Sequence, residues 1–167
     1  MPVKLAGVIA LLAPGQGAQT PGMLTPWLIE AADRAALARW SEAADLDLER
    51  LGTTADAEEI RDTAVTQPLV VATALLAYAA LARAAPLVPS RIIAAGHSVG
   101  ELAAAAVADV LTPDAAVALA AVRGREMAAA CAVERTGMSA VLGGKPDDVL
   151  ARLEELGLDP ANRNGAG

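Results

Sequence analysis

A strand, a glycine-containing turn and a helix are expected to follow one another between residues 92 and 107. This succession restricts the fold more than any other feature. The run Ile-Ile-Ala-Ala at residues 92–95 is apolar and suits a strand. Gly-His-Ser-Val-Gly-Glu at residues 96–101 supplies small residues for a tight turn, and the alanine-rich run at 102–107 favours a helix. A strand that leads directly into a helix is typical of parallel sheets, so the sequence predicts an α/β fold.

The turn has the pattern Gly-x-Ser-x-Gly, which in a nucleophile elbow exposes a serine hydroxyl at the end of a strand. The helix that begins after Ser98 points unpaired backbone N–H groups and the positive end of its dipole toward the same place. Ser98 is therefore a candidate nucleophile, and the backbone N–H of Val99 is a candidate donor to an oxyanion. The alternative is an ordinary glycine-rich turn in which the serine is incidental.

Composition limits both the core and the partners. Hydrophobic residues make up 54% of the 167 residues, but aromatic residues are only 2% and phenylalanine is absent, so the core must be aliphatic. The net charge of -7 argues against nucleic acid or an anionic membrane as a partner. The single histidine and the single cysteine provide neither a metal-ligand cluster nor an intrachain disulfide. We therefore expect no metal site.

The N-terminal apolar run at residues 5–13 is predicted to be a buried parallel strand, because β-branched residues lie in its middle. A short signal peptide is the alternative, and the Pro-Gly turn that follows directly argues against it. The loop Pro-Gly-Gln-Gly-Ala-Gln at residues 14–19 lies at the carboxyl end of this strand, where α/β sheets bind ligands. The backbone N–H of Gln16 is a second candidate oxyanion donor, and an ordinary tight turn is the alternative.

Three long helices are predicted along the chain, each with a proline near its first turn, at residues 26–44, 69–84 and 113–133. The middle helix is apolar nearly all round and should be buried. No stretch has the length and flanks of a membrane-spanning helix, so we expect a soluble, cytoplasmic protein. A short strand at 138–142 and a helix at 146–156 follow, and this order is half of a small α+β unit.

Two further expectations concern an acidic segment and the cysteine. Residues 53–62 are polar and acidic, which favours a solvated helix followed by a loop. Cys131 lies in an alanine-rich helical run, so we expect a small buried side chain rather than a reactive thiol.

Two side chains near the candidate nucleophile need separate treatment. His97 is adjacent to Ser98, and neighbouring side chains on a tight turn usually point apart, so we expect His97 to support the pocket rather than to act as the base. Arg123 follows an apolar run in the third helix, and its planar guanidinium suits bidentate contact with a carboxylate. Arg125 and Glu126 beside it favour the alternative of a solvated helix face.

Four motifs occur in a particular order and spacing. They are Pro-Gly-Gln-Gly-Ala-Gln at 14–19, Thr-Gln-Pro at 66–68, Gly-His-Ser-Val-Gly-Glu at 96–101, and Arg-Gly at 123–124 with Met127 following. In this combination the chain resembles the malonyl-CoA:acyl carrier protein transacylases of type-II fatty acid or polyketide systems. The resemblance implies an α/β-hydrolase-like acyltransferase domain with a parallel sheet and a nucleophile elbow. Residues 1–133 would form the N-terminal part of this domain, and residues 134–167 the first part of a ferredoxin-like subdomain.

The resemblance also implies a mechanism. Ser98 would attack the thioester of malonyl-CoA, the N–H groups of Gln16 and Val99 would hold the oxyanion, and Arg123 would bind the free carboxylate of malonate. The malonyl group would then pass from Ser98 to the phosphopantetheine thiol of an acyl carrier protein.

The remaining residues that the resemblance assigns line the pocket: Gln67, His97 and Met127. The implied reaction takes coenzyme A thioesters as substrates and uses no bound cofactor.

The sequence also departs from the family. The histidine that serves these enzymes as general base belongs to the second half of their fold, and none is present at a matching place here. We therefore expect this chain alone to transfer malonate poorly. Two alternatives stay open: a serine hydrolase of the esterase or patatin-like kind, and a non-catalytic remnant that only binds carrier protein or coenzyme A.

Overall fold

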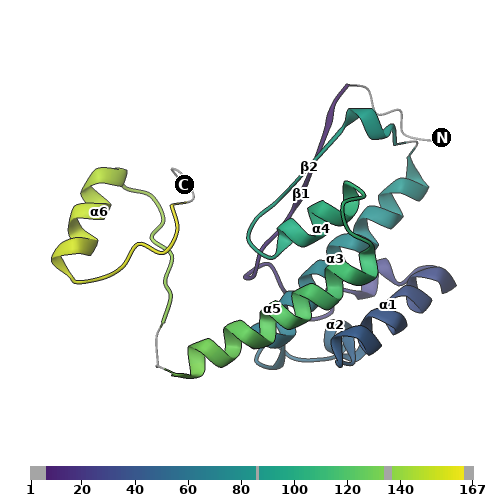
Figure 1. Ribbon diagram of the computed structural model, residues 1–167, viewed down its shortest axis with the longest axis horizontal. Coiled ribbons are helices and arrows are strands. Elements are labelled where there is room, and N and C mark those ends of the chain that lie inside the picture. The colour runs from purple at the N-terminus through teal and green to yellow at the C-terminus, as the bar shows by residue number, and fades with distance from the viewer. Residues whose placement is uncertain (1–6, 86, 134–136, 164–167) are drawn as a thin grey trace. The chain divides into compact units, whose positions relative to one another are not determined.

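The computed structural model describes residues 7–85, 87–133 and 137–163, and the chain divides into two compact units. The first unit, Met1–Glu134, contains a small parallel sheet and most of the helices (Figure 1). The second unit, Arg135–Gly167, contains one helix in its described part. The α/β class that the sequence predicts is confirmed for the first unit, which is mostly helical.

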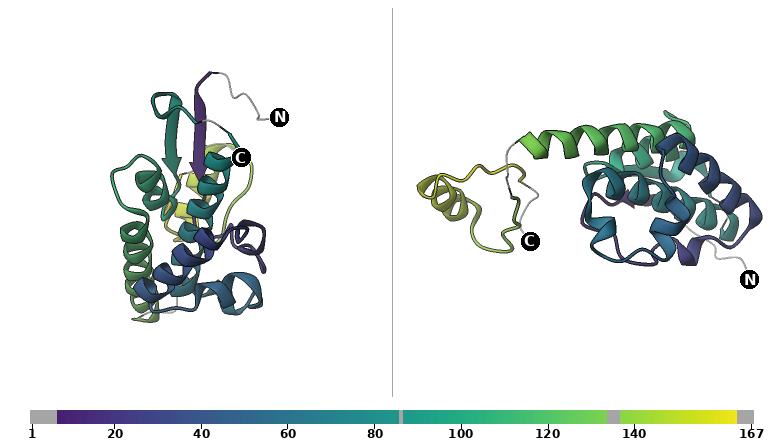
Figure 2. Two further views of the ribbon diagram at one scale, coloured as in Figure 1. Left: turned by 90° about the vertical axis from the view of Figure 1, so that its right-hand side faces the viewer. Right: turned by 90° about the horizontal axis from the view of Figure 1, so that it is seen from below.

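The sheet consists of β1 (Ile9–Ala13) and β2 (Ile92–Gly96), which pair in parallel with Ala13 opposite Gly96. Figure 2 shows the two strands side by side and running in the same direction. Both strands were expected, but β1 is shorter than the predicted 5–13, of which residues 5 and 6 lie outside the described part of the chain. The carboxyl ends of both strands therefore meet at one edge of the sheet, where the glycine loop and the serine turn begin.

Helices cover one side of this sheet. In chain order, the helical elements of the first unit are η1 (Thr25–Trp27), α1 (Ala31–Ala44), α2 (Leu48–Thr53), η2 (Glu59–Arg61), α3 (Thr63–Ala84), η3 (Pro89–Arg91), α4 (Gly100–Val107) and α5 (Pro113–Val133). The long helices α3 and α5 pack against each other, and α4 lies between them and the sheet. The core is aliphatic, as the composition requires, and its fully buried side chains include Leu24, Leu37, Leu69, Val71 and Val117.

One face of the sheet remains open, which contradicts the expectation of a buried strand. Side chains alternate between the two faces of the strands, and those on the outer face are exposed to a large extent: 78% for Leu12 and 60% for Ile93. Val8, just before β1, is 68% exposed. The apolar pattern therefore predicted the strand correctly but not its burial. A strand is buried on both faces only when helices or loops cover both faces of the sheet, and the described residues cover one.

Local capping explains where two helices differ from the expected boundaries. The helix expected at 26–44 is divided, because α1 begins only at Ala31, where Glu30 and Asp33 form a capping box. The helix expected at 69–84 begins at Thr63, because the Asp62 side chain accepts a hydrogen bond from the Ala64 N–H at 2.7 Å. The helix expected at 113–133 is confirmed.

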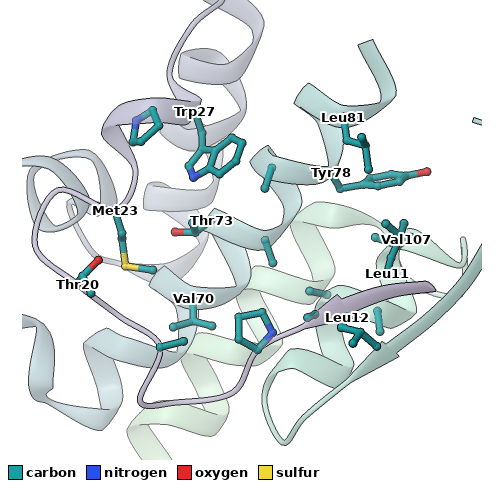
Figure 3. Close-up of a pocket in the computed structure, with 18 of the residues that line it drawn as sticks. Leu11, Leu12, Thr20, Met23, Trp27, Val70, Thr73, Tyr78, Leu81 and Val107 are labelled. Atoms are coloured by element: carbon teal, nitrogen blue, oxygen red, sulfur yellow. The ribbon is translucent and has the colours of Figure 1, made fainter. Parts of the chain in front are cut away.

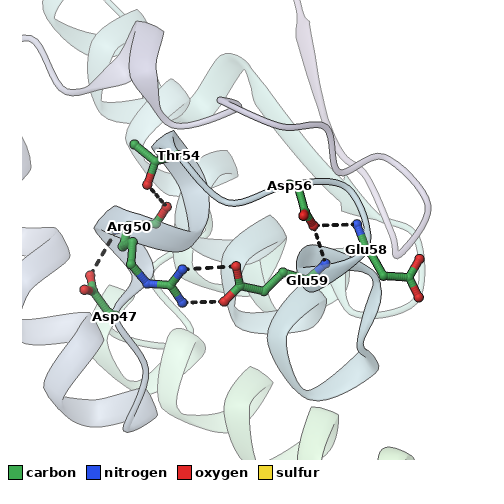
Figure 4. Close-up of polar contacts among 6 residues, drawn as sticks. All are labelled: Asp47, Arg50, Thr54, Asp56, Glu58 and Glu59. Atoms are coloured by element: carbon green, nitrogen blue, oxygen red, sulfur yellow. Dashed lines mark hydrogen bonds and ion pairs between the residues drawn. The ribbon is translucent and has the colours of Figure 1, made fainter.

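The segment between α2 and α3 was also predicted incorrectly. Helix α2 ends where the acidic helix was expected to begin, and the single turn η2 follows. Figure 4 shows the contacts that hold this connection: Arg50 forms a bidentate ion pair with Glu59, and Asp56 accepts from the N–H groups of Glu58 and Glu59. The hydrogen bonds from Arg50 lower the pKa of the Glu59 carboxyl. Side-chain pairing thus replaces the expected solvated helix.

The C-terminal end of α5 is exposed, and this affects the cysteine. Cys131 is exposed rather than buried, because the last turns of the helix lack covering side chains among the described residues. The expectation of a buried cysteine was wrong.

In the second unit, α6 (Pro146–Glu155) matches the predicted helix, and Gly157 follows with a φ of 65° that suits a helix end. The strand expected at 138–142 is absent from the described residues. A strand needs a hydrogen-bonded neighbour, and the described part of this unit contains none. Its large apolar side chains, Met138, Val141 and Leu142, are exposed instead.

Contrary to the expectation that no stretch has the length for it, helix α3 is long and apolar enough to cross a membrane by length and composition. Half of its apolar window is buried inside the protein, as in a core helix.

Candidate active site

Ser98 occupies a strained position between β2 and α4. Its φ is 55°, in the left-handed region that costs a residue with a side chain roughly 1–2 kcal/mol. The turn is held by two backbone hydrogen bonds: the N–H of Gly100 donates to the carbonyl of His97 at 3.0 Å, and the N–H of Glu101 donates to the carbonyl of Ser98 at 3.1 Å. Ser98 is exposed, whereas Val99 directly after it is fully buried. The serine is therefore presented outward from a rigid turn.

The glycines on either side of Ser98 are required by close backbone contacts. A Cβ at Gly96 would collide with the backbone of Gly100, and a Cβ at Gly100 would collide with the backbone of Ala13 at the end of β1. The N–H of His97 also donates to the carbonyl of Ala13 at 3.0 Å. The serine turn thus packs directly on the end of the first strand.

The glycine loop after β1 lies against the same turn. A Cβ at Gly15 would lie 2.7 Å from Nδ1 of His97, so the imidazole lies beside this loop. The Gln16 side chain donates to Oγ1 of Thr63 at 3.0 Å, which ties the loop to the first turn of α3. Gln16 and Val99, the two candidate oxyanion donors, therefore belong to segments that meet at one end of the sheet.

Arg123 reaches the serine from α5. Its Nη2 donates to Oγ of Ser98 at 3.2 Å, and its Nη1 donates to Oε1 of Gln67 at 2.6 Å. Gln67 is on α3 and fully buried, and its Nε2 donates to the Sδ of Met127 at 3.2 Å. Four of the residues selected from the sequence thus form one continuous chain of hydrogen bonds that joins α3, α5 and the serine turn.

The solvated alternative for Arg123 does not fit this geometry. Its side chain is partly buried and contacts the candidate nucleophile, whereas Arg125 turns away and donates to the carbonyl of Ala44 at 3.2 Å. The arrangement offers a nucleophilic hydroxyl with a cation at hydrogen-bonding distance. Such a pair suits a substrate that carries both an electrophilic carbonyl and an anionic group.

Sequence reasoning included Gly124 in a motif but missed its role in the packing of the two long helices. Gly124 follows Arg123, and a Cβ on it would lie only 2.8 Å from the carbonyl oxygen of Thr63. A glycine in the middle of a helix next to a partly buried arginine is a signal for such a close helix contact.

A separate apolar cavity of about 570 Å³ lies between the sheet, α3, α4 and the loop that contains η1 (Figure 3). Its larger lining side chains include Leu11, Met23, Trp27, Tyr78 and Val107, and Ser98 is not among them. It is therefore distinct from the candidate active site.

Among the residues whose placement the structure describes, no three of the His, Cys, Asp and Glu side chains gather closely enough to hold a metal ion.

Comparison with known proteins defines the class. The acyl transferase domain family matches residues 11–154, which is most of the chain, and the chain belongs to this family. Its similar relatives carry a more specific name. Over 160 residues it is 64% identical to the malonyl CoA-acyl carrier protein transacylase of Mycobacterium tuberculosis. This match covers 96% of the chain and 53% of the relative. The protein of that name from Staphylococcus aureus is 34% identical over 165 residues, covering 95% of this chain and 52% of the relative.

Solved structures give the same result. A crystal structure of MCAT from Mycobacterium tuberculosis superimposes with a TM-score of 0.87 at 64% identity, over 96% of this chain and 53% of that one. The malonyl-CoA:acyl carrier protein transacylase of Helicobacter pylori superimposes with a TM-score of 0.79 at 29% identity, over 90% of this chain and 48% of that one. The chain thus spans about half the length of the relatives it matches.

Proposed function

We propose that this chain is the serine-bearing half of a malonyl-CoA:acyl carrier protein transacylase. The contact of 3.2 Å between Nη2 of Arg123 and Oγ of Ser98 carries the proposal, because it places a carboxylate-binding group beside the nucleophile. The names of the relatives, with 64% identity over almost the whole chain, supply the substrate. In this proposal the turn at Ser98 is a nucleophile elbow.

The proposal extends to the fold. Residues 1–133 form the N-terminal part of an α/β-hydrolase-like acyltransferase domain, and residues 134–167 form the first part of a ferredoxin-like subdomain.

The first step transfers the malonyl group to the protein. The Ser98 oxygen attacks the thioester carbonyl carbon of malonyl-CoA, and a base removes the hydroxyl proton. The N–H groups of Gln16 and Val99 stabilise the tetrahedral oxyanion. The carbon–sulfur bond then breaks, and coenzyme A leaves as the thiol with the proton. The product is a malonyl ester on Ser98.

The second step passes the malonyl group on. The phosphopantetheine thiol of an acyl carrier protein attacks the ester carbonyl carbon, and its sulfur forms the new thioester bond. The bond between that carbon and the Ser98 oxygen breaks, and the thiol proton returns to the Ser98 oxygen. Malonyl-CoA supplies the malonyl group already activated as a thioester, and the carrier protein supplies a reactive thiol. The reaction therefore uses no bound cofactor. Fatty acid or polyketide biosynthesis in the cytoplasm is the setting that we propose for this exchange.

Arg123 holds the free carboxylate in both steps. A charge-assisted hydrogen bond of this kind contributes roughly 1.5–3 kcal/mol, which corresponds to a preference of about ten- to a hundredfold for malonyl over acetyl groups. Met127 and His97 shape the pocket around it.

The general base that removes the Ser98 proton is not assigned to any residue of this chain. His97 lies beside Gly15 on the glycine loop, which fits a supporting role. We propose that the base comes from the portion of the domain that the longer relatives possess. The chain alone should then acquire malonate slowly.

Intact-protein mass spectrometry tests the proposal directly. The chain is incubated with excess malonyl-CoA, and the expected result is one malonyl group per protein, absent from Ser98→Ala. The rate should rise when the complementary half of the Mycobacterium tuberculosis relative is added. Rapid hydrolysis of neutral esters without a malonyl adduct would favour a serine hydrolase. Binding of carrier protein without any adduct would favour a non-catalytic role.

A further inference from the structure

The environment of Gln67 connects two parts of the site. This amide is fully buried, on the second turn of α3, and it contacts side chains of α5 at both ends. Its Oε1 accepts from Nη1 of Arg123 at 2.6 Å, and its Nε2 donates to Sδ of Met127 at 3.2 Å.

The chemistry of the two neighbours fixes the orientation of the amide. A guanidinium has only donors, so the amide oxygen must face Arg123. The NH2 group is then directed to the thioether of Met127, which is a weak acceptor. A buried amide with neither contact would carry an unpaired donor and an unpaired acceptor, which destabilises the folded state, so the hydrogen bond between the amide and the guanidinium restrains both groups.

The helix packing makes this hold rigid. Gly124, next to Arg123, allows α5 to approach α3 so closely that a Cβ would lie 2.8 Å from the carbonyl oxygen of Thr63. Gln67 lies one turn after Thr63 on the same helix. The acceptor for Nη1 therefore lies on the same helix as this close contact, one turn further along, and this restricts an arginine side chain that is otherwise flexible.

The charge of the contact matters as much as its geometry. Gln67 is neutral, and Arg123 forms no ion pair within residues 7–85, 87–133 and 137–163. A carboxylate in the place of Gln67 would hold the guanidinium equally well but would neutralise it. The neutral amide positions the cation and leaves its charge for a ligand.

We infer that Gln67 is a positioning residue that selects for acyl groups bearing a second carboxylate. It fixes Nη1 of Arg123 so that Nη2 lies beside the oxygen of Ser98. When that oxygen attacks the thioester carbonyl of a short dicarboxylic monothioester, the free carboxylate of the same acyl group is within reach of the guanidinium. The inference rests on the proposed function, since it concerns the same site.

Binding measurements separate this inference from the transfer reaction. Ser98→Ala cannot be acylated, so calorimetry on this variant gives dissociation constants for malonyl-CoA and acetyl-CoA. The two ligands share the coenzyme A portion, and the ratio of their constants isolates the effect of the carboxylate. The same ratio is then measured after adding Gln67→Leu, which removes the acceptor, or Gln67→Glu, which keeps the acceptor and adds a charge.

We expect each Gln67 substitution to reduce the malonyl preference about tenfold, with little change for acetyl-CoA. The control is Thr66→Val, in the preceding position. Thr66 is equally buried and donates to the carbonyl of Ile60 at 2.6 Å, away from the site. It should lower the melting temperature and leave the ratio unchanged.

The outcomes distinguish the two proposals. If the Ser98→Ala parent binds both ligands equally, the carboxylate clamp of the proposed function fails. If the parent prefers malonyl-CoA and folded Gln67→Glu retains that preference, the role of Gln67 fails.

NMR of the Arg123 guanidinium in the unsubstituted chain tests whether Gln67 holds it, without any change to Gln67. Separate Nη signals are expected for an anchored group, and averaged signals from free rotation would overturn the inference.

Discussion

Arg83, at the end of α3, donates from Nη1 and Nη2 to the two carboxylate oxygens of Asp33, each at 2.9 Å. Asp33 is 3% exposed and also completes the capping box of α1. This pair therefore fastens the beginning of one helix to the end of another.

Removal of Arg83 should destabilise the protein, because the buried carboxylate of Asp33 would lose its partner. We expect Arg83→Met to lower the free energy of unfolding by about 2 kcal/mol. Chemical denaturation measures the change. Arg61→Met is the matched control, since Arg61 pairs with exposed Glu58 at 3.7 Å and its loss should change stability little.

The same pair makes stability depend on pH. Burial alone would raise the pKa of Asp33, but the hydrogen bonds from Arg83 and from the Glu30 N–H outweigh it, so the pKa is lowered. A carboxyl whose pKa is lower in the folded state stabilises the protein above its unfolded pKa, near 4, and this contribution is lost as pH falls through the folded value. Melting temperatures from pH 6 down to pH 2 should therefore fall less steeply for Asp33→Asn than for the unsubstituted chain. Parallel curves would contradict this.

Ser98 should carry a stability cost for its conformation. Glycine adopts a φ of 55° without penalty, so Ser98→Gly is expected to raise the free energy of unfolding by about 1 kcal/mol while abolishing the malonyl adduct. Ser98→Ala keeps the Cβ and should remove the adduct without the gain. Equal unfolding free energies for the two variants would show that the turn is not strained.

Arg123 should determine which acyl group is loaded. Arg123→Ala is expected to slow acylation of Ser98 by malonyl-CoA at least tenfold and to spare acetyl-CoA, because only malonate has a second carboxylate. Rates of adduct formation by mass spectrometry provide the test. An equal loss for both thioesters would indicate a general structural defect.

The contact between α3 and α5 should not tolerate a methyl group at Gly124. Gly124→Ala would push a Cβ to 2.8 Å from the Thr63 carbonyl, and we expect a loss of roughly 1–3 kcal/mol in the free energy of unfolding. Gly137→Ala is the control, since nothing lies within 4 Å of its added Cβ. An unchanged free energy of unfolding for Gly124→Ala would mean that α3 and α5 can move apart at little cost.

Local sequence signals predicted those elements that local chemistry determines. Helix α5 follows its expected boundaries because Thr112 caps it, accepting from the Ala115 N–H at 3.1 Å, and Pro113 occupies its first position. The start of α3 was missed because the capping residue, Asp62, lies in a run of charges that looked like a loop.

The candidate site shows a similar division. The serine turn could be predicted because its small residues lie within five positions of one another, and its two glycines, Gly96 and Gly100, are required by close backbone contacts. The hydrogen bond between Arg123 and Gln67 joins residues 56 positions apart on two helices, so no local pattern specifies it. The resemblance to a family brought these residues together in the prediction, and the packing of α3 on α5 gives the physical reason.

The open face of the sheet has a consequence for measurements of stability. Leu12 and Ile93 present apolar surface to water from adjacent strands, and any species that covers this surface binds the folded state alone. By mass action, the apparent melting temperature of the chain should increase with the concentration of whatever associates there, including the chain itself. The measured stability of this protein should thus depend on the concentrations in the solution as well as on the sequence.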